Sequence, residues 1–308
     1  MQSILGANGP VATTLAKELA LHYTTEIRLV SRHPKKVNQG DEIFAADLLD
    51  ANATLKAVAG STVSYFTAGL PMDARQWKAQ FPTMMRNVIR ACQQHQCKLV
   101  FFDNTYMYAK NAAPQTEESP FVVTGSKSAT RAQMANMLLD EIKQGRIEAM
   151  ICRAPEFYGP RGTKSITHSL ILQNITKNRA LRVPISDRTL RSLIWVPDAA
   201  RAMALLANTP DAYQQTRHLP CDVQRMTYQQ LIALASEIVR KPLPYSVVKR
   251  WQFWLMGLYK PAVRELAELL PRYRYDNIFV SDKFKQRFPS FTITTYKEGI
   301  ERVLGDGH

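Results

Sequence analysis

Short apolar segments alternate with longer amphipathic stretches through the first half of the chain. The apolar runs predict strands at residues 3–5, 26–30, 42–45, 63–67, 98–102 and 147–152. Helical periodicity falls between them, at residues 11–22, 52–59, 76–95 and 126–144. Such alternation is typical of parallel β-α-β units, and strands that are apolar on both faces need helices on both sides of their sheet. The pattern therefore predicts an α/β fold with a doubly wound parallel sheet.

The regular alternation ends near residue 152. Further helices are predicted at residues 167–178, 197–208, 227–240 and 262–269, with longer loops and short extended segments between them. No spacer rich in serine, glycine or proline separates the two halves. We therefore expect a sheet domain at residues 1–152 and a smaller C-terminal lobe at residues 153–308 that is interleaved with the last strands of the sheet.

Composition places the chain among ordinary globular proteins, with 45% hydrophobic and 21% charged residues in a length of 308. The four cysteines form no C-x-x-C pair, so we expect no metal site and no disulfide framework. Reduced thiols and an N-terminus without a charged, apolar leader fit a cytoplasmic protein. The longest apolar stretch, residues 251–259, is far shorter than the roughly 20 residues of a spanning helix. We expect it to pack in a core or within the C-terminal lobe, and we expect no membrane partner; docking on a membrane surface is the less favoured alternative.

The net charge of +14 is concentrated in the second half of the chain. Residues 1–150 hold 16 basic and 13 acidic side chains, whereas residues 151–308 hold 24 and 13. Only residues 272–275 interleave arginine and tyrosine as a nucleic-acid-binding element would. The charge therefore predicts a solvated basic surface, or a lobe that attracts an anionic small-molecule substrate, and no nucleic-acid partner.

A glycine turn follows the first predicted strand and opens the first predicted helix, with the sequence G-A-N-G-P-V-A at residues 6–12. Gly6 permits a tight turn, and Gly9 lets backbone amides approach a pyrophosphate. Pro10 suits a first helical turn, where its missing N–H is not needed. At the first junction of a parallel sheet, this spacing favours nucleotide binding over an ordinary glycine turn.

The second strand ends next to a basic residue, Arg32. In dinucleotide-binding folds an acidic residue there binds the ribose 2′-hydroxyl, whereas a basic residue accommodates a 2′-phosphate. Arg32 therefore favours NADP over NAD, the alternative being an ordinary surface arginine. Asp47 follows the third strand and could bind the adenine amino group or cap its own loop.

Four segments carry a resemblance to a known family: I-L-G-A-N-G-P-V-A, V-F-F-D-N-T-Y-M-Y, C-R-A-P-E-F-Y-G-P and R-S-L-I-W-V-P-D-A-A-R-A. They resemble the extended and atypical branches of the short-chain dehydrogenase/reductase superfamily, the NAD(P)-dependent epimerase/dehydratase-like proteins. The resemblance implies a Rossmann-type sheet and a substrate-binding C-terminal lobe. It also implies that residues 153–160 line the nicotinamide end of the cofactor and that residues 191–202 support the substrate lobe.

The catalytic positions depart from the family pattern. The family uses a Tyr-x-x-x-Lys pair, in which the lysine binds the nicotinamide ribose and lowers the pKa of the tyrosine that exchanges a proton with substrate. Lys127 matches the lysine, but the position four residues before it is Val123, which cannot transfer a proton. A solvated lysine at a helix start is the alternative for Lys127.

The remaining catalytic candidates follow the fifth strand. The family's Ser/Thr position corresponds to Asn104, with Thr105 one residue away. Tyr106 and Tyr108 are candidates for a relocated phenol because ligands of such sheets bind at the carboxyl ends of the strands. A structural role in ring packing is the alternative for both tyrosines.

Cofactor-binding candidates come from the glycine turn, the ends of the second, third and fourth strands, the lysine helix and the segment after the sixth strand. They are Gly6, Asn8, Gly9, Pro10, Val11, Arg32, Asp47, Thr67, Ala68, Lys127, Ala154, Pro155 and Phe157. We expect an NADP(H)-dependent oxidoreductase or an epimerase/dehydratase-like enzyme acting on a small carbonyl or sugar-derived substrate. A catalytically degenerate NADP(H) sensor or scaffold is the alternative, and the resemblance implies a possible homodimer through residues 76–95 and 126–144.

Overall fold

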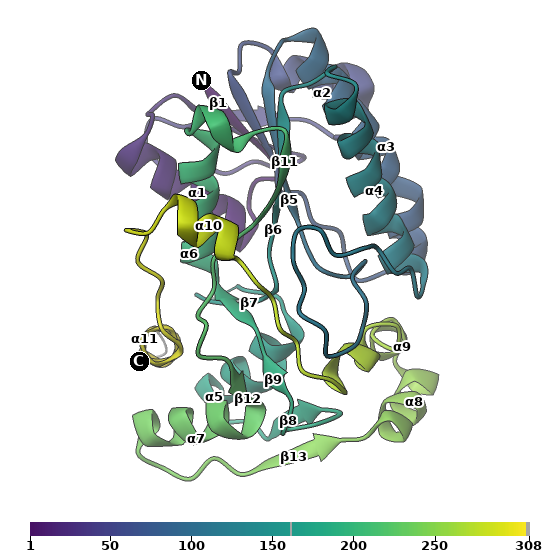
Figure 1. Cartoon of the computed structure of the whole chain (residues 1–308), viewed down its shortest axis with the longest axis vertical. Helices are drawn as coiled ribbons and strands as arrows, with labels where there is room; N and C mark the ends of the chain where they lie inside the picture. The colour runs from purple at the N-terminus through teal and green to yellow at the C-terminus, as the bar shows by residue number, and fades with distance from the viewer. Residues whose placement is uncertain (161, 306–308) are drawn as a thin grey trace. The chain divides into compact units, whose positions relative to one another are not determined.

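The apolar segments of the first half pair into one parallel sheet of seven strands (Figure 1). The computed structural model describes residues 1–160 and 162–305. The strand order is β11-β6-β5-β4-β1-β2-β3, and every neighbouring pair is parallel. The strands are β1 (Gln2–Leu5), β2 (Ile27–Ser31), β3 (Glu42–Ala45), β4 (Val63–Phe66), β5 (Lys98–Asp103), β6 (Ala149–Arg153) and β11 (Gln215–His218). The predicted α/β fold with a doubly wound parallel sheet is confirmed.

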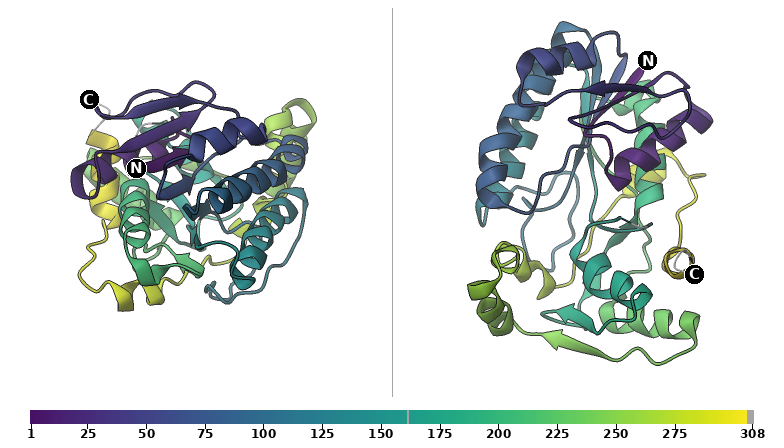
Figure 2. Two further views of the ribbon diagram at one scale, coloured as in Figure 1. Left: turned by 90° about the horizontal axis from the view of Figure 1, so that it is seen from above. Right: turned by 180° about the vertical axis from the view of Figure 1, so that it is seen from behind.

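Helices cover both faces of this sheet (Figures 1 and 2). One face carries α1 (Pro10–His22) and α6 (Val196–Ala207), and the other carries α2 (Ala51–Val58), α3 (Ala74–Gln94) and α4 (Ser126–Lys143). Local side chains set some of the helix starts: Asp50 accepts hydrogen bonds from backbone amides of α2, and Asp73 does the same for α3. The two-sided cover explains why the central strands are apolar on both faces.

The strand order reverses between β1 and β4. From β1 the chain runs outward through β2 and β3, and then returns to build β4, β5 and β6 on the other side of β1. In open parallel sheets, ligands bind outside the carboxyl ends of the strands at this reversal. The residues that follow the ends of β1 and β4 are therefore the candidates for a cofactor site.

The second compact unit is built from short strands and helices. Three two-stranded sheets pair β7 (Glu156–Tyr158) with β10 (Leu193–Trp195), β9 (Leu190–Arg191) with β12 (Met226–Thr227), and β8 (Leu181–Pro184) with β13 (Tyr245–Val248). The helices are a π-helix (His168–Leu172), α5 (Gln173–Thr176), α7 (Tyr228–Val239), α8 (Arg250–Tyr259), α9 (Pro261–Arg264), α10 (Asp282–Arg287) and α11 (Tyr296–Gly305). Short 3-10 turns lie at Pro210–Ala212 in the first unit and at Leu270–Tyr273 in the second.

The two units interleave along the chain. The first comprises residues 1–107, 126–154 and 199–219; the second comprises residues 108–125, 155–198 and the chain from residue 220 onward. A division into cofactor-binding residues 1–152 and substrate-binding residues 153–308 stays a prediction. Among residues 1–160 and 162–305, none of the helices has the length and apolarity that a bilayer crossing requires.

One expectation for the second half is wrong, and another holds only in part. The helix predicted at residues 262–269 is only α9, because the chain turns after Arg264 and buries Leu269 and Leu270. The apolar stretch at residues 251–259 forms a helix, α8, whose Phe253 packs in a small core cluster with Val248 and Leu270. Most of its large apolar side chains face solvent.

Candidate functional site

Gly6 brings the ends of β1 and β4 into close contact. Its φ of +99° lies in the left-handed region, and a Cβ placed on it would lie 2.3 Å from Cα of Ala68. The amides of Gly6 and Ala7 both donate to the carbonyl oxygen of Val30 at 2.9 Å, which turns the chain across β2. The amide of Thr67 donates to the Leu5 carbonyl oxygen at 2.9 Å. The structure therefore brings together Gly6, Thr67 and Ala68 where the strand order reverses.

The start of α1 is open to an anion. Gly9 is the N-cap and has no capping side chain, Pro10 follows it, and the first turn holds no acidic residue. A Cβ placed on Gly9 would meet no atom within 4 Å. Val11, in the first turn of the helix, is buried. The backbone amides of a first helical turn and the positive end of the helix dipole make such a helix start a site for phosphate.

Asn8 ties the glycine turn to the loop that carries Arg32. With a φ of +80°, Asn8 donates from Nδ2 to the His33 carbonyl oxygen at 2.7 Å and to Oγ of Ser31 at 3.2 Å. Its Oδ1 accepts the amide of Lys35 at 3.1 Å. These bonds hold residues 31–35 beside the glycine turn, so Asn8 positions the loop that carries Arg32.

Arg32 and Asp47 follow the ends of β2 and β3. Arg32 is exposed on the loop that Asn8 orders. Asp47 is also exposed, and its Oδ1 accepts the amide of Leu49 at 3.0 Å. That bond is the loop-capping role that the sequence left open for Asp47, while a contact to adenine stays a prediction.

Lys127 is a buried lysine. It is the second residue of α4, and its exposed fraction is 2%. The alternative of a solvated lysine at a helix start is therefore wrong. Burying an ammonium group is costly unless polar partners compensate it, which favours a specific role. Val123, four residues earlier, is exposed and belongs to the second unit.

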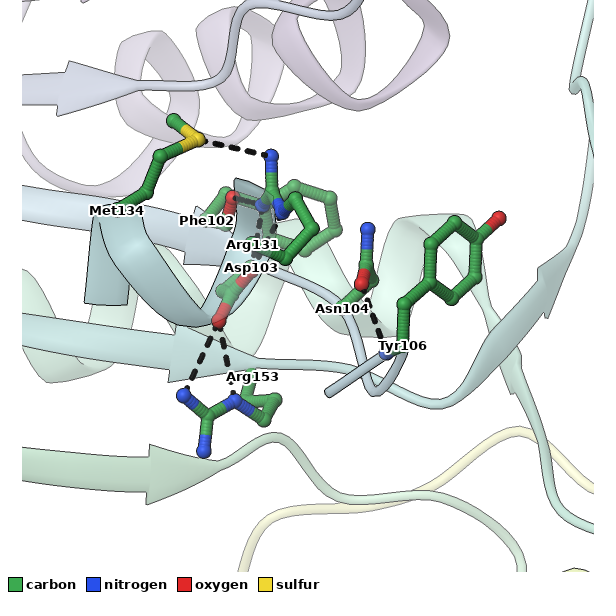
Figure 3. Close-up of polar contacts among 7 residues, drawn as sticks. All are labelled: Phe102, Asp103, Asn104, Tyr106, Arg131, Met134 and Arg153. Atoms are coloured by element: carbon green, nitrogen blue, oxygen red, sulfur yellow. Dashed lines mark hydrogen bonds and ion pairs between the residues drawn. The ribbon is translucent and has the colours of Figure 1, made fainter. Parts of the chain in front are cut away.

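A buried charge cluster lies at the carboxyl ends of β5 and β6 (Figure 3). Oδ1 of Asp103 accepts Nε of Arg131 at 2.9 Å and Nη2 at 2.5 Å, and Oδ2 accepts Nε and Nη2 of Arg153, both at 3.1 Å. Arg131 also lies over the rings of Phe81 and Phe101. Sequence reasoning missed this cluster, although charged residues at the ends of two apolar strands were a usable signal.

Asn104, Thr105 and Tyr106 follow directly from this cluster. Oδ1 of Asn104 accepts the amide of Tyr106 at 2.9 Å, which makes a tight turn (Figure 3). Thr105 is buried, whereas Tyr106 is partly exposed. The Tyr106 ring stacks on Trp77, with centroids 6.0 Å apart and planes 8° apart, and its hydroxyl points away from Asp103 (Figure 3). The ring of Tyr106 thus packs on Trp77 just beyond the carboxyl end of β5.

Tyr108 has a different environment. It is buried, its ring contacts Phe121, and the two residues form an isolated antiparallel bridge in the second unit. A buried ring in a backbone bridge matches the packing role that the sequence left open for Tyr108. Of the two tyrosines, Tyr106 is the one whose side chain solvent reaches.

The segment after β6 crosses from the first unit to the second. Ala154 is buried, and its amide donates to the Asp103 carbonyl oxygen at 3.0 Å. Pro155 and Phe157 belong to the second unit. Between them, Glu156 is buried and accepts from the Thr167 amide at 2.7 Å and from the Tyr273 hydroxyl at 2.9 Å. With both carboxylate oxygens bonded internally, Glu156 is a structural anchor of this unit.

Arg191 is a buried cation in the second unit. Its guanidinium lies 4.6 Å from the centroid of the Tyr273 ring, and Nη1 donates to the Arg272 carbonyl oxygen at 2.9 Å. Within the part of the chain that the structure describes, Nε and Nη2 of Arg191 have no hydrogen-bond partner. A buried guanidinium with two such donors is suited to an anionic group.

Known structures share this fold. UDP-glucuronic acid 4-epimerase from Bacillus cereus, in complex with UDP-glucuronic acid and NAD, is similar with a TM-score of 0.82 and 13% identity, over 100% of this chain and 99% of that chain. dTDP-glucose 4,6-dehydratase from Bacillus anthracis, in complex with NAD, has a TM-score of 0.80 and 12% identity, over 99% of this chain and 96% of that chain. UDP-glucose 4-epimerase from Thermus thermophilus, also in complex with NAD, has a TM-score of 0.78 and 15% identity, over 100% of this chain and 99% of that chain.

These identities are low, so the structural likeness establishes the fold alone. A search of curated proteins finds no match. The model of the NAD dependent epimerase/dehydratase family matches residues 3–221, which include the glycine turn, Lys127 and the segment after β6. The chain therefore belongs to the NAD dependent epimerase/dehydratase family, a family of enzymes.

Proposed function

We propose that this protein is an NADP(H)-dependent oxidoreductase or epimerase/dehydratase-like enzyme that acts on a small, anionic, sugar-derived or carbonyl substrate. The observation that carries the proposal is the glycine turn at the strand-order reversal, where Gly6 brings two strand ends together and α1 starts without a side-chain cap. The residues present fit a dinucleotide: α1 amides for the diphosphate, Arg32 for a 2′-phosphate and Lys127 for the nicotinamide ribose. When bound, the nicotinamide supplies reversible hydride transfer.

An anionic substrate is supported by Arg191. Its buried Nε and Nη2, which lack a partner among the described residues, would make stronger hydrogen bonds to a carboxylate or phosphate than to a neutral oxygen. The enzyme from Bacillus cereus was crystallised with UDP-glucuronic acid, a nucleotide sugar. Nucleotide sugars are therefore the substrate class to test first.

Turnover is the direct test of the proposed function. The protein is incubated with NADP or NADPH and a panel of nucleotide sugars and small carbonyl compounds. Cofactor absorbance detects net redox turnover, and NMR of the sugar detects epimerisation or dehydration that leaves the cofactor unchanged. We expect product from at least one anionic substrate. Cofactor binding without product from any class would favour the second candidate, an NADP(H) sensor, which the valine at position 123 favours.

Cofactor preference has its own prediction. We expect NADPH to bind about ten- to hundredfold more tightly than NADH, because a guanidinium bonded to a phosphate typically contributes about 1.5–3 kcal/mol. Arg32→Asp should abolish or reverse that difference, and calorimetric titration measures it. Lys56→Asp, another exposed basic residue of the first unit, is the matched control and should preserve the preference. Equal affinities of the unaltered protein for the two cofactors would contradict the assignment of Arg32.

Proton transfer is assigned to Tyr106. Tyr106→Phe is expected to lower kcat by about 10²–10⁴-fold and to remove a basic limb from the pH profile, while the Kd for NADPH stays unchanged. Tyr108→Phe is the control, because its ring is buried in a bridge with Phe121, and it should alter kcat little. If Tyr108→Phe carries the loss and Tyr106→Phe does not, the assignment of the phenol is wrong.

A further inference from the structure

Helix α8 presents an apolar face to solvent. Positions 251, 254, 255, 258 and 259 follow the spacing of one helical face, and all five carry large apolar or aromatic side chains. Their exposed fractions are 61% for Trp251, 66% for Trp254, 43% for Leu255, 59% for Leu258 and 86% for Tyr259. We call these five residues the α8 face. Soluble surfaces rarely gather so many large apolar side chains in one row, so this face needs a partner.

The α8 face is held in place by the opposite side of the helix. Phe253 is buried and packs in a small cluster with Val248 and Leu270. Gly257 is also buried, and a Cβ placed on it would lie 3.4 Å from Cα of Arg264 in the neighbouring α9. α8 has a buried apolar anchor on one side and an exposed apolar row on the other.

The charged residues next to the α8 face along the chain, Lys249, Arg250, Lys260 and Arg264, are all basic, and the nearest acidic residue in the sequence is Glu265. Residues 240–264 contain six basic side chains and no acidic one. The six are Arg240, Lys241, Lys249, Arg250, Lys260 and Arg264, and each is exposed. Lys249 directly precedes α8, Arg250 is its first residue and Lys260 directly follows it, so positive charge lies at both ends of the apolar row. The natural partner of this surface combines an apolar layer with a negatively charged border.

We propose that the α8 face docks on the surface of a membrane that contains anionic lipids, with the helix lying in the headgroup region. An interfacial helix places its apolar side chains below the headgroups and its basic residues among them. Tryptophan and tyrosine prefer this boundary, because their rings are apolar and their N–H and O–H groups are polar. At 1.5 Å per residue the helix is about 15 Å long, which suits lying on a bilayer and excludes crossing one.

The same charges disfavour a second copy of this chain as the partner. A two-fold symmetric contact through α8 brings the helix of one copy against the same helix of the other. Antiparallel helices would then set Lys249 and Arg250 of one copy near Lys260 of the other, and parallel helices would pair each basic end with itself. Both arrangements place like charges together at an apolar contact. The proposal replaces the expectation of no membrane partner and is independent of the proposed enzymatic function.

Tryptophan fluorescence tests the proposal on the full chain. The protein has four tryptophans, and the other two, Trp77 and Trp195, are buried. Vesicles of phosphatidylcholine alone and of phosphatidylcholine with phosphatidylglycerol are titrated in, with sedimentation as a second readout. We expect anionic vesicles to shift the emission to the blue, to protect it from acrylamide and to sediment the protein. Pure phosphatidylcholine should bind at least about tenfold more weakly, because each basic residue near an anionic surface contributes roughly fivefold.

Two variants and their controls make the test specific. Leu255→Ser with Leu258→Ser keeps both reporter tryptophans and should abolish binding, whereas Leu21→Ser with Ile43→Ser removes exposed apolar residues of the first unit and should not. Lys249→Glu with Lys260→Glu should weaken binding to anionic vesicles by at least about tenfold, whereas Lys17→Glu with Lys56→Glu should not. Circular dichroism checks that each variant is folded.

Three results would overturn the proposal. The first is no association with either vesicle. The second is association that the α8 variants leave intact, or that is equally strong without phosphatidylglycerol. The third is self-association in light scattering that Leu255→Ser with Leu258→Ser abolishes, which would assign the α8 face to a second copy of the chain.

Discussion

Asp103→Asn is expected to destabilise the protein by about 3–5 kcal/mol, the loss typical when one partner of a buried ion pair is removed. The Asp103 side chain has no solvent exposure, and it accepts four hydrogen bonds from the guanidiniums of Arg131 and Arg153. Asparagine preserves the shape but removes the negative charge and replaces one acceptor with a donor. Two buried cations would then face each other without compensation.

Urea unfolding measures this loss as a lower midpoint at an unchanged slope. Glu141→Gln is the control, because its pair with Arg146 lies near the surface and such pairs contribute about 0–1 kcal/mol. Adding Arg153→Met to Asp103→Asn should recover part of the stability, since it removes one uncompensated cation. A loss below about 1 kcal/mol for Asp103→Asn, or a further loss in the double variant, would show that buried charge is not the cause.

The cluster also bears on the site, because Asp103 directly precedes Asn104 and Arg131 lies one helical turn after Lys127 on α4. Loosening it should disturb two catalytic candidates at once. We therefore expect the Asp103→Asn variant to lose turnover even when a stabilising osmolyte keeps it folded. The loss should exceed the fraction of the variant that is unfolded.

Gly6→Ala is expected to destabilise the fold and to abolish cofactor binding. Alanine pays about 1–2 kcal/mol for a left-handed backbone, and its Cβ would lie 2.3 Å from the backbone of Ala68, where no side-chain rotation relieves the overlap. Overpacking adds about 1–3 kcal/mol. The strand ends must separate, which moves the amides at the start of α1 away from the strand-order reversal.

Thermal unfolding and calorimetric titration with NADPH separate these effects. Gly145→Ala is the matched control, because Gly145 has a φ of +67° but no atom within 4 Å of a placed Cβ, so only the backbone cost applies.

Gly9→Asp provides the opposite case: the fold has room for the side chain, but a carboxylate at the helix start repels a diphosphate. We expect Gly9→Asp to retain the melting temperature and lose NADPH binding. If it retains binding, the diphosphate does not rest on α1.

Several features of the fold were predictable because they depend on local sequence. The strands β1 to β6 and the helices α1 to α4 follow from alternating apolar and amphipathic runs. The turn between β1 and α1 follows from the two glycines, Gly6 and Gly9, because a tight junction between a strand and a helix favours glycine. Family membership was likewise accessible, because short motifs at strand ends carry it. The α9 helix was overestimated because apolar periodicity cannot distinguish a helix from a turn that buries the same leucines.

The sequence by itself determined the parallel sheet, the position of the glycine turn and the departure at Val123, since each depends on residue identity and on neighbours a few positions away. Only the tertiary structure decided that Lys127 is buried, that Asp103 joins Arg131 and Arg153, that Tyr106 is more accessible than Tyr108, and that α8 turns its apolar row outward. Burial and charge pairing depend on which distant segments pack together, and a linear pattern of apolar residues does not reveal which side of a helix the rest of the chain will cover.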